Sequence, residues 1–269
     1  MVQHLSEAGS YDENVPYCFC MLAFGAPYRL AAKEFSQQLQ KYGVELIVAT
    51  DQPDDFADSP GVVAIKFHRR SILYPYNDKR FALAAALEHY ECAVLVDADS
   101  TIEGELPKYL HVPPGMYAAV AYKSLEETLN LYYAHNFKAW QKLAGRFKID
   151  LKKTQWVSEN LVIVRRDQGR EKDFLELWAV ADRWLGIRRK FQVDAAYIGV
   201  AAAKVGWKVY RHDDFKKMRA NISHNGHKSI GIQGRAGQSG NAISKRFNFY
   251  RRWLLAVLCT LYQPQKYWL

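Results

Sequence analysis

Two aspartates stand one residue apart where an apolar segment ends. Cys92–Val96 is apolar throughout and leads directly into Asp97-Ala98-Asp99, a pattern typical of a buried β-strand followed by a turn. Mg²⁺ and Mn²⁺ prefer oxygen ligands in a partly open shell, and a cation between two carboxylates offsets their repulsion. We therefore predict that Asp97 and Asp99 bind a divalent ion. The alternative is that they only cap a turn through local hydrogen bonds.

Strand and helix patterns alternate along the chain before this pair. Helical spacing predicts helices over 28–42 and 79–90, and apolar runs predict strands over 17–23, 44–49, 61–67 and 92–96. This order predicts an α/β fold with a mostly parallel central sheet flanked by helices. Ligands bind at the carboxyl ends of the strands in such sheets. Ala23 and Phe24, at the end of the first strand, are therefore candidates for contacting a nucleotide.

The helix that begins at Lys79-Arg80-Phe81-Ala82-Leu83, together with the acidic segment 92–102, resembles the donor half of glycosyltransferases with the A-type fold. The sequence pattern is most similar to that of the glycogenin-like and bacterial galactosyltransferase families. The resemblance implies a Rossmann-like nucleotide-diphospho-sugar transferase fold and a nucleotide-sugar donor, with a UDP-sugar expected. It implies Mn²⁺ or Mg²⁺ on Asp97 and Asp99, and Lys79 or Arg80 near the nucleotide or its diphosphate. It extends over about 17–228, and only the acidic pair and its strand are specific.

The same families carry a late histidine followed by glycine and lysine, which returns to the metal and the phosphates. This chain has Ser223-His224-Asn225-Gly226-His227-Lys228, whose spacing departs from the family pattern. The resemblance implies His224 as a third metal ligand, with His227 as the alternative. Lys228 would neutralise the leaving diphosphate.

An acceptor hydroxyl must lose a proton, which calls for a base within hydrogen-bond reach if the anomeric centre inverts. Candidate residues are Glu159 and Asn160, which interrupt an apolar strand predicted over 156–164, and Asp194. A helix is predicted from about Asp194 to Lys204, so Asp194 could instead be its N-cap. Trp156, beside these polar residues, is a candidate for stacking on a sugar ring. A helix over 171–184 and a strand over 207–210 complete this half.

The excess of positive charge lies at the end of the chain. The net charge is +9, yet no acidic residue follows Asp214, whereas ten basic ones do. This imbalance predicts a local anionic partner. We divide the chain into one glycosyltransferase-like domain, 1–228, with a donor half at about 16–110 and an acceptor half at 111–228. A flexible loop, 229–243, and a basic, aromatic segment, 244–269, follow it.

Residues 245–269 mix arginine, lysine and aromatic side chains before an apolar stretch. Such a segment can lie in the interface of an anionic membrane, which would suit a glycan or lipid-linked acceptor. It could equally form a helix that docks on the domain. We expect no nucleic-acid partner, because no recognition motif is visible.

Composition excludes some classes of protein. The chain has 269 residues, of which 49% are hydrophobic, and this composition predicts a packed globular core. No run approaches the roughly 20 apolar residues of a membrane-spanning helix, and no signal peptide is recognisable. We expect a cytoplasmic protein, peripheral at most on the inner face of a membrane.

Two rival functions remain. Asp97-Ala98-Asp99-Ser100-Thr101 also fits the signature of haloacid-dehalogenase-type phosphatases, in which Asp97 would be the nucleophile and Asp213-Asp214 the later acidic pair. Against this, that signature normally follows the first strand of its domain. The other rival is a non-enzymatic module that binds a membrane surface or a polyanion.

Overall fold

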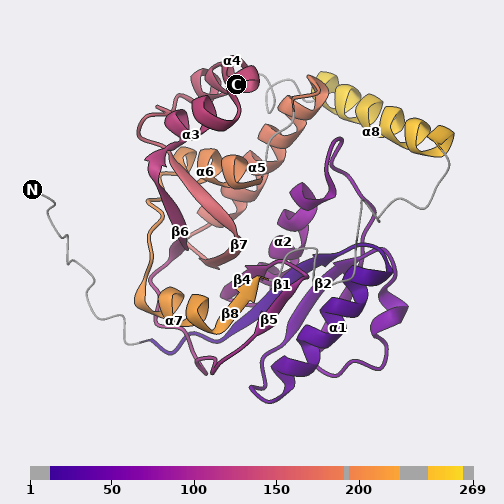
Figure 1. The fold of residues 1–269 in the computed structure, drawn as a ribbon, viewed down its shortest axis with the longest axis vertical. Coiled ribbons are helices and arrows are strands. Elements are labelled where there is room, and N and C mark those ends of the chain that lie inside the picture. Colours follow the sequence, from indigo (N-terminus) through magenta and orange to yellow (C-terminus); the bar gives the residue numbers. More distant parts are fainter. Residues whose placement is uncertain (1–12, 191–193, 225–241, 263–269) are drawn as a thin grey trace, which may run out of the picture.

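The computed structural model describes residues 13–190, 194–224 and 242–262. A six-stranded sheet in the order β3-β2-β1-β4-β7-β6 forms its centre, and β5 and β8 form a separate two-stranded ribbon (Figure 1). The strands are β1 (Tyr17–Ala23), β2 (Leu46–Thr50), β3 (Val62–Lys66), β4 (Cys92–Val96), β5 (Ser100–Ile102), β6 (Gly115–Ser124), β7 (Gln155–Arg165) and β8 (Ile222–His224). The predicted α/β class is confirmed.

Helices join and cover these strands. They are α1 (Ala26–Gln40), α2 (Lys79–His89), α3 (Leu125–Tyr132), α4 (Ala134–Phe147), α5 (Arg170–Ile187), α6 (Asp194–Lys204), α7 (Asp213–Asn221) and α8 (Ala242–Tyr262), with short 3-10 turns at Pro53–Phe56 and Pro75–Asp78. The predicted bounds of α6 are matched in full, and those of α1, α2 and α5 differ by one to three residues.

The first four strands of the sheet order are parallel. β1 pairs in parallel with β2 on one side and β4 on the other, while β2 pairs in parallel with β3. β7 pairs antiparallel to β4, and β6 antiparallel to β7. The sheet is thus mostly parallel, as predicted, with an antiparallel extension.

Burial explains why these segments form central strands. Every residue of β4 is 0% exposed, and β1 and β2 are nearly as fully buried. A strand covered on both faces reads as an unbroken apolar run, and each large aliphatic side chain contributes about 1.5–3 kcal/mol on burial. The apolar runs of β1, β2 and β4 are therefore the interior of the sheet, whereas the run of β3 forms its edge, with Val63 42% exposed.

Helix α6 lies unusually close to β7. A Cβ added at Gly199 in α6 would collide with the backbone carbonyl oxygen of Gln155 in β7. Only glycine allows this approach. Asp194, the first residue of α6, is buried beneath the helix layer that covers the sheet.

Two expectations about the second half were incomplete or wrong. The strand expected over 207–210 is absent: both backbone polar groups of Val209 bond to the side-chain amide of Gln155 instead of to a neighbouring strand. Tyr210 forms only an isolated bridge to Tyr117. Strand β6 and helices α3, α4 and α7 were not anticipated.

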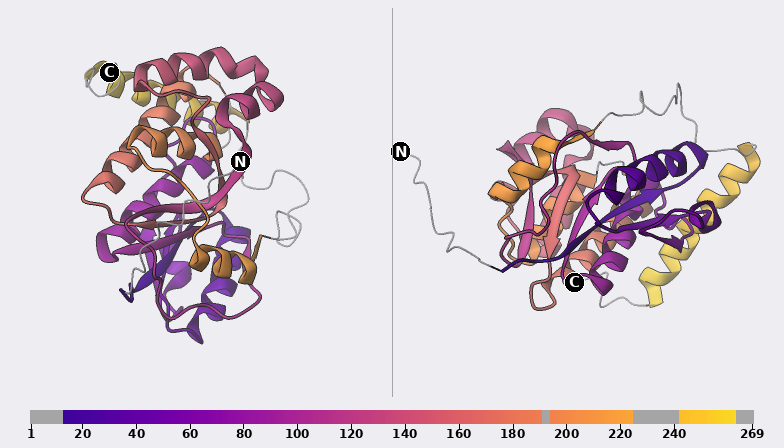
Figure 2. Two further views of the ribbon diagram at one scale, coloured as in Figure 1. Left: turned by 90° about the vertical axis from the view of Figure 1, so that its left-hand side faces the viewer. Right: turned by 90° about the horizontal axis from the view of Figure 1, so that it is seen from below.

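The C-terminal segment forms a helix that begins at Ala242, inside the loop expected over 229–243. Helix α8 lies at the periphery and packs on α5, where the Trp253 indole donates to the carbonyl of Ile187 at 3.0 Å (Figures 1 and 2). In the described part of the chain, no helix has both the length and the apolarity needed to span a bilayer.

Candidate metal and donor site

The topology of the sheet defines where a ligand can bind. The connections from β1 lead through α1 to β2 and then β3, whereas the next crossover, through α2, returns past β1 to β4. Right-handed crossovers in opposite directions place α1 and α2 on opposite faces and leave a crevice between the carboxyl ends of β1 and β4. Ala23 and Asp97, at the ends of these two strands, flank this switch point.

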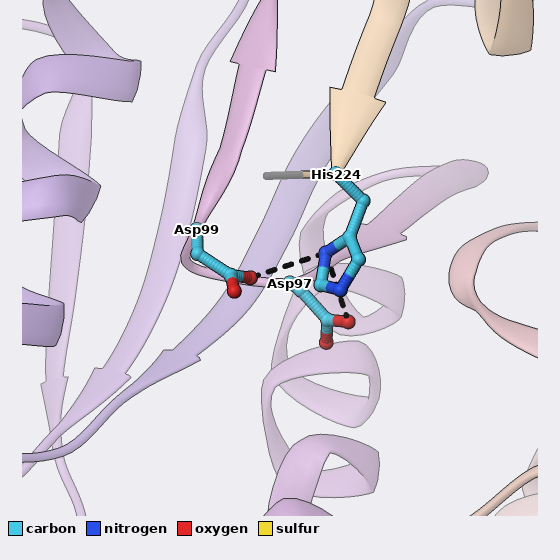
Figure 3. Close-up of side chains that lie close together, drawn as sticks. All are labelled: Asp97, Asp99 and His224. Atoms are coloured by element: carbon cyan, nitrogen blue, oxygen red, sulfur yellow. Dashed lines mark ion pairs between the residues drawn. The ribbon is translucent and has the colours of Figure 1, made fainter. Parts of the chain in front are cut away.

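The acidic pair and His224 come together at this crevice. In Figure 3 the side chains of Asp97, Asp99 and His224 converge, and one ligand atom of each lies within 4.8 Å of the others. His224 Nδ1 is 3.2 Å from a carboxylate oxygen of Asp99 and 3.6 Å from one of Asp97.

The β5–β8 ribbon carries His224 to this position. Asp99 passes directly into β5, and the antiparallel register of the ribbon sets Ser100 opposite His224. Beyond the ribbon, the amide of Glu103 donates to the carbonyl of Asn221 at 2.8 Å, and the amide of Ile102 donates to the Gln38 side chain of α1. Backbone pairing, not side-chain packing alone, therefore fixes the histidine beside the carboxylates.

The group fits a divalent metal ion. Two carboxylates and one imidazole suit Mn²⁺ well and Mg²⁺ through the oxygens. Asp99 is 7% exposed and His224 reaches solvent, so an ion could enter from one side. The buried hydroxyl of Ser100 has no hydrogen-bond partner in the described residues, which leaves an oxygen free next to the pair.

Lys79 bridges Asp97 to Asp194. Its ammonium forms ion pairs with a carboxylate oxygen of Asp97 and, at 2.9 Å, with Asp194. Burial alone would lower the pKa of Lys79, but the carboxylates of Asp194 and Asp97 outweigh it and raise that pKa. Lys79 is therefore a fixed positive charge directly behind the acidic pair. The position near the nucleotide or its diphosphate, which the resemblance implied for Lys79 or Arg80, stays a prediction.

Glu159 on β7 faces the same buried group. Burial, and then the charge of Asp194, raise the pKa of Glu159 to about 7, although Lys79 acts in the opposite direction. Burial likewise raises the pKa of Asp194. A carboxyl group with a pKa near neutrality can either keep or release its proton under physiological conditions.

This raised pKa predicts a pH-dependent stability. The folded protein holds a proton on Glu159 between its ordinary pKa of 4.5 and about 7, whereas the unfolded chain does not. The free energy of unfolding should therefore fall as the pH rises through this window, by up to about 1.4 kcal/mol per pH unit for one proton. Glu159→Gln should flatten the fall in denaturant titrations at pH 5, 6, 7 and 8. Glu88→Gln, at an exposed helix position, should leave the pH dependence of the unfolding free energy unchanged. The same pH dependence in the parent and in both variants would contradict the prediction.

Other predicted residues lie apart from this group. Arg80 is buried in a different ion pair, 3.2 Å from Asp182. Asn160 accepts a hydrogen bond from Ser158 at 3.0 Å, which puts those two side chains on one face of β7 and Glu159 on the other, since side chains alternate along a strand. The predicted polar island Glu159-Asn160 is thus divided between two faces.

The remaining candidates stand as follows. Ala23 is buried at the end of β1, and the ring of Phe24 stacks on Phe67 with centroids 5.7 Å apart. Lys228 and the alternative ligand His227 lie outside the described residues. Asp214, one of the two aspartates that a phosphatase would require, lies at the start of α7. It accepts a hydrogen bond from the backbone amide of His111 and makes no described contact with Asp97.

Three tyrosines near the site were not among the predicted site residues. Burial raises the pKa of Tyr28, and so do the charges of Asp99 and Asp97, so its hydroxyl lies near the acidic pair. Burial, and then the charge of Asp194, raise the pKa of Tyr76. Burial, and then the charge of Glu159, raise the pKa of Tyr133. Tyr28 follows the turn after the first strand, a position that could have pointed to it; Tyr76 and Tyr133 carry no such signal.

Comparison with solved structures assigns the architecture to the A-type fold of glycosyltransferases, as expected. The galactosyltransferase LgtC, solved in complex with donor and acceptor sugar analogues, matches with a TM-score of 0.50 and 12% identity over 88% of this chain and 94% of LgtC. An active-site mutant of LgtC matches with a TM-score of 0.50 and 8% identity over 86% of this chain and 94% of that one.

A further match is to the bifunctional glycosyltransferase WbbM, with a TM-score of 0.48 and 11% identity over 80% of this chain. This chain spans 46% of the length of WbbM. No protein-family model and no curated protein sequence matches. At these identities the similarity establishes the fold alone.

Proposed function

We propose that this protein is a metal-dependent glycosyltransferase that moves a sugar from a nucleotide-diphosphate sugar to an acceptor hydroxyl. The observation that carries the proposal is the convergence of Asp97, Asp99 and His224 at the switch point of an A-type fold. The acidic pair and its strand were visible in the sequence; the third ligand is supplied by a ribbon that only the fold creates.

The proposed donor is a UDP-sugar and the proposed ion is Mn²⁺ or Mg²⁺, held by Asp97, Asp99 and His224. Such an ion supplies positive charge where a diphosphate leaving group becomes negative. Lys79 holds one oxygen of Asp97, leaving the other directed toward His224. Its role in this proposal is to position Asp97 and to limit the net negative charge of the site.

The proposed proton acceptor for the acceptor hydroxyl is Glu159, because its pKa of about 7 suits proton transfer at neutral pH. Asp194, already paired with Lys79, would orient the sugar through its remaining hydrogen-bonding capacity. Trp156 lies parallel to Tyr133, at 13° with centroids 5.9 Å apart. Aromatic surface of this kind suits the apolar face of a sugar. The charge of Glu159 raises the pKa of Tyr133 after burial, so we place the acceptor beside Tyr133.

The test is to supply UDP- and GDP-sugars with Mn²⁺ and to follow nucleoside-diphosphate release, alongside phosphate release from a phosphoester. Metal-dependent release of nucleoside diphosphate is expected. Phosphate release alone would favour a phosphatase, and neither product, with varied metals and acceptors, would favour a binding module.

We also propose that α8 holds the protein against an anionic membrane, where a lipid-linked acceptor would be found. Five large apolar side chains recur every three or four residues along α8 and are 49–68% exposed; they are Phe247, Tyr250, Leu254, Leu258 and Leu261. Arg246 and Arg251 are exposed on the same helix. An apolar stripe flanked by cations matches the interface of an anionic bilayer.

Replacing Leu254 and Leu258 together by glutamate should lower binding to phosphatidylglycerol vesicles about tenfold, because apolar area is lost and negative charge is added. Sedimentation with vesicles measures this. Leu30→Glu, at a 59% exposed leucine on α1, is the matched control and should bind as the parent does. Equal loss in both variants, or none in either, would exclude α8 as the membrane contact.

A further inference from the structure

A second concave site lies away from the acidic pair, between helices that the proposed mechanism does not use. Helices α4, α5 and α8 lie on one side of the molecule (Figure 1) and border a small hollow that is partly open to solvent. Its lining is Arg146, Val180, Arg183, Trp184, Ile187, Arg188 and Thr260. Three of these seven residues are arginines, and no acidic residue of the described chain lines the hollow.

The arginines are organised around one indole ring. The guanidinium of Arg188 lies 3.8 Å from the ring centroid of Trp184, and that of Arg146 lies 5.8 Å from it. Arg188 Nη1 also donates to the backbone carbonyl of Trp184 at 2.9 Å. Stacking and this hydrogen bond hold the guanidinium in one orientation, which reduces the entropy lost when it binds an anion.

Like charges in this hollow repel one another. Burial lowers the pKa of Arg188, and the positive charge of Arg146 lowers it further. The carboxylate of Asp182, which precedes Arg183 in α5, accepts hydrogen bonds from Ser71, Asn77 and Arg80. Its negative charge is thus committed to a buried network on another side of the helix.

The indole itself has an unused donor. Trp184 is 7% exposed, and its buried Nε1 has no hydrogen-bond partner among the described residues. The hydroxyl of Thr260, on α8, donates its proton to the carbonyl of Ala256 at 2.8 Å, so this residue offers the hollow one acceptor and no donor. The lining is thus rich in donors and poor in acceptors, which favours an anion with several oxygens.

We propose that the hollow between α4, α5 and α8 binds a phosphoryl group, held by the guanidinium groups of Arg146, Arg183 and Arg188. Arginine presents a planar fork of donors that matches phosphate oxygens. The group could belong to a lipid headgroup reached from the α8 side or to a soluble phosphorylated ligand. This inference does not depend on the proposed transferase activity, since it concerns binding at a site without the metal ligands.

The experiment measures the binding of inorganic phosphate and of glycerol phosphate to the full chain by calorimetry, without divalent metal. Arg188→Gln and Arg146→Gln should each weaken binding about tenfold, as expected for the loss of a charged hydrogen-bond donor. Arg170→Gln, on the same helix but paired with Asp167 outside the hollow, is the matched control and should bind as the parent does.

Stability provides a second readout that a folding defect would not imitate. The melting temperature of each protein without phosphate is its own baseline, because Arg188→Gln relieves a like-charge contact but also loses its stacking on Trp184 and its hydrogen bond. Phosphate should raise the melting temperature of the parent and of Arg170→Gln more than that of the hollow variants. Equal stabilisation of all four proteins, or of none, would overturn the proposal.

A third arm identifies the source of the phosphoryl group. If it is a lipid headgroup, phosphatidylglycerol vesicles should bind the parent more than Arg188→Gln, and glycerol phosphate should compete only weakly. If the ligand is soluble, glycerol phosphate should bind and Arg188→Gln should sediment with vesicles as the parent does. Vesicle binding that is lost only in the Leu254 and Leu258 double variant would assign the membrane contact to the outer face of α8 alone.

Discussion

Replacing Asp99 by asparagine is expected to weaken metal-dependent binding of a UDP-sugar by about a hundredfold or more, because a metal-ligating carboxylate is lost. The fold should survive. Asp99 makes no described bond that supports the core, and its carboxylate sits beside Asp97 around one imidazole. Neutralising one of two neighbouring carboxylates removes a repulsion, so the melting temperature without metal should stay equal or rise.

Isothermal titration of Mn²⁺ in the presence of UDP-sugar measures the first effect, and thermal unfolding without metal measures the second. Asp54→Asn, at an exposed aspartate in a 3-10 turn, is the control and should leave both unchanged. Unaltered metal-dependent affinity in a folded Asp99→Asn protein would show that the ion binds elsewhere. A lower melting temperature would show that Asp99 serves the fold.

Replacing Lys79 by methionine should lower the free energy of unfolding by about 3–5 kcal/mol at pH 8, the usual cost of removing one partner from a buried ion pair. Lys79 is 7% exposed, and its loss leaves Asp97 and the buried Asp194 without their cation. Burial raises the pKa of Asp194 while Lys79 lowers it, so without the lysine the pKa of Asp194 in the folded state would rise further. Such a group stabilises the folded state when protonated, and this contribution disappears as the pH rises through the raised pKa.

The loss in free energy of unfolding caused by Lys79→Met should therefore be smaller at pH 5 than at pH 8, as measured by denaturant unfolding at both pH values. Adding Asp194→Asn should recover part of the loss at pH 8, because the second variant removes one of the two unpaired charges. Lys41→Met, at an exposed lysine, should change stability little at either pH. A deficit independent of pH and of Asp194 would point to lost packing of the lysine stem instead of lost charge.

The part of the site that the sequence predicts is the part encoded locally. A continuous apolar run followed by Asp97 and Asp99 identifies both the strand and the position where it ends, because burial on two faces leaves no other pattern. His224 was inferred only from a family resemblance. Nothing around Ile222–His224 indicates a strand, since three residues form one only when a partner such as β5 is aligned beside them.

Most of the features that could not be predicted depend on contacts between segments far apart in the sequence. The ion pair between Lys79 and Asp194 joins two helix starts 115 residues apart, and it depends on the close approach of α6 to β7 at Gly199. Glu159 and Asn160 are neighbours, so the sequence grouped them, although strand alternation could already have separated them. Strand β6 was missed although residues 116–122 form a continuous apolar run like that of β4; only its last two residues are polar.

The β5–β8 ribbon also makes the ion-binding group a reporter of folding. Its two strands lie about 120 residues apart in the chain, and closing so long a loop costs entropy that local contacts do not repay. During refolding, Asp97 and Asp99 would be in place as soon as β4 joins the sheet, whereas the imidazole arrives only when the intervening chain has been organised. The signal of Mn²⁺ coordinated by nitrogen should therefore lag behind the recovery of helical and strand structure, marking the moment at which the two ends of the domain meet.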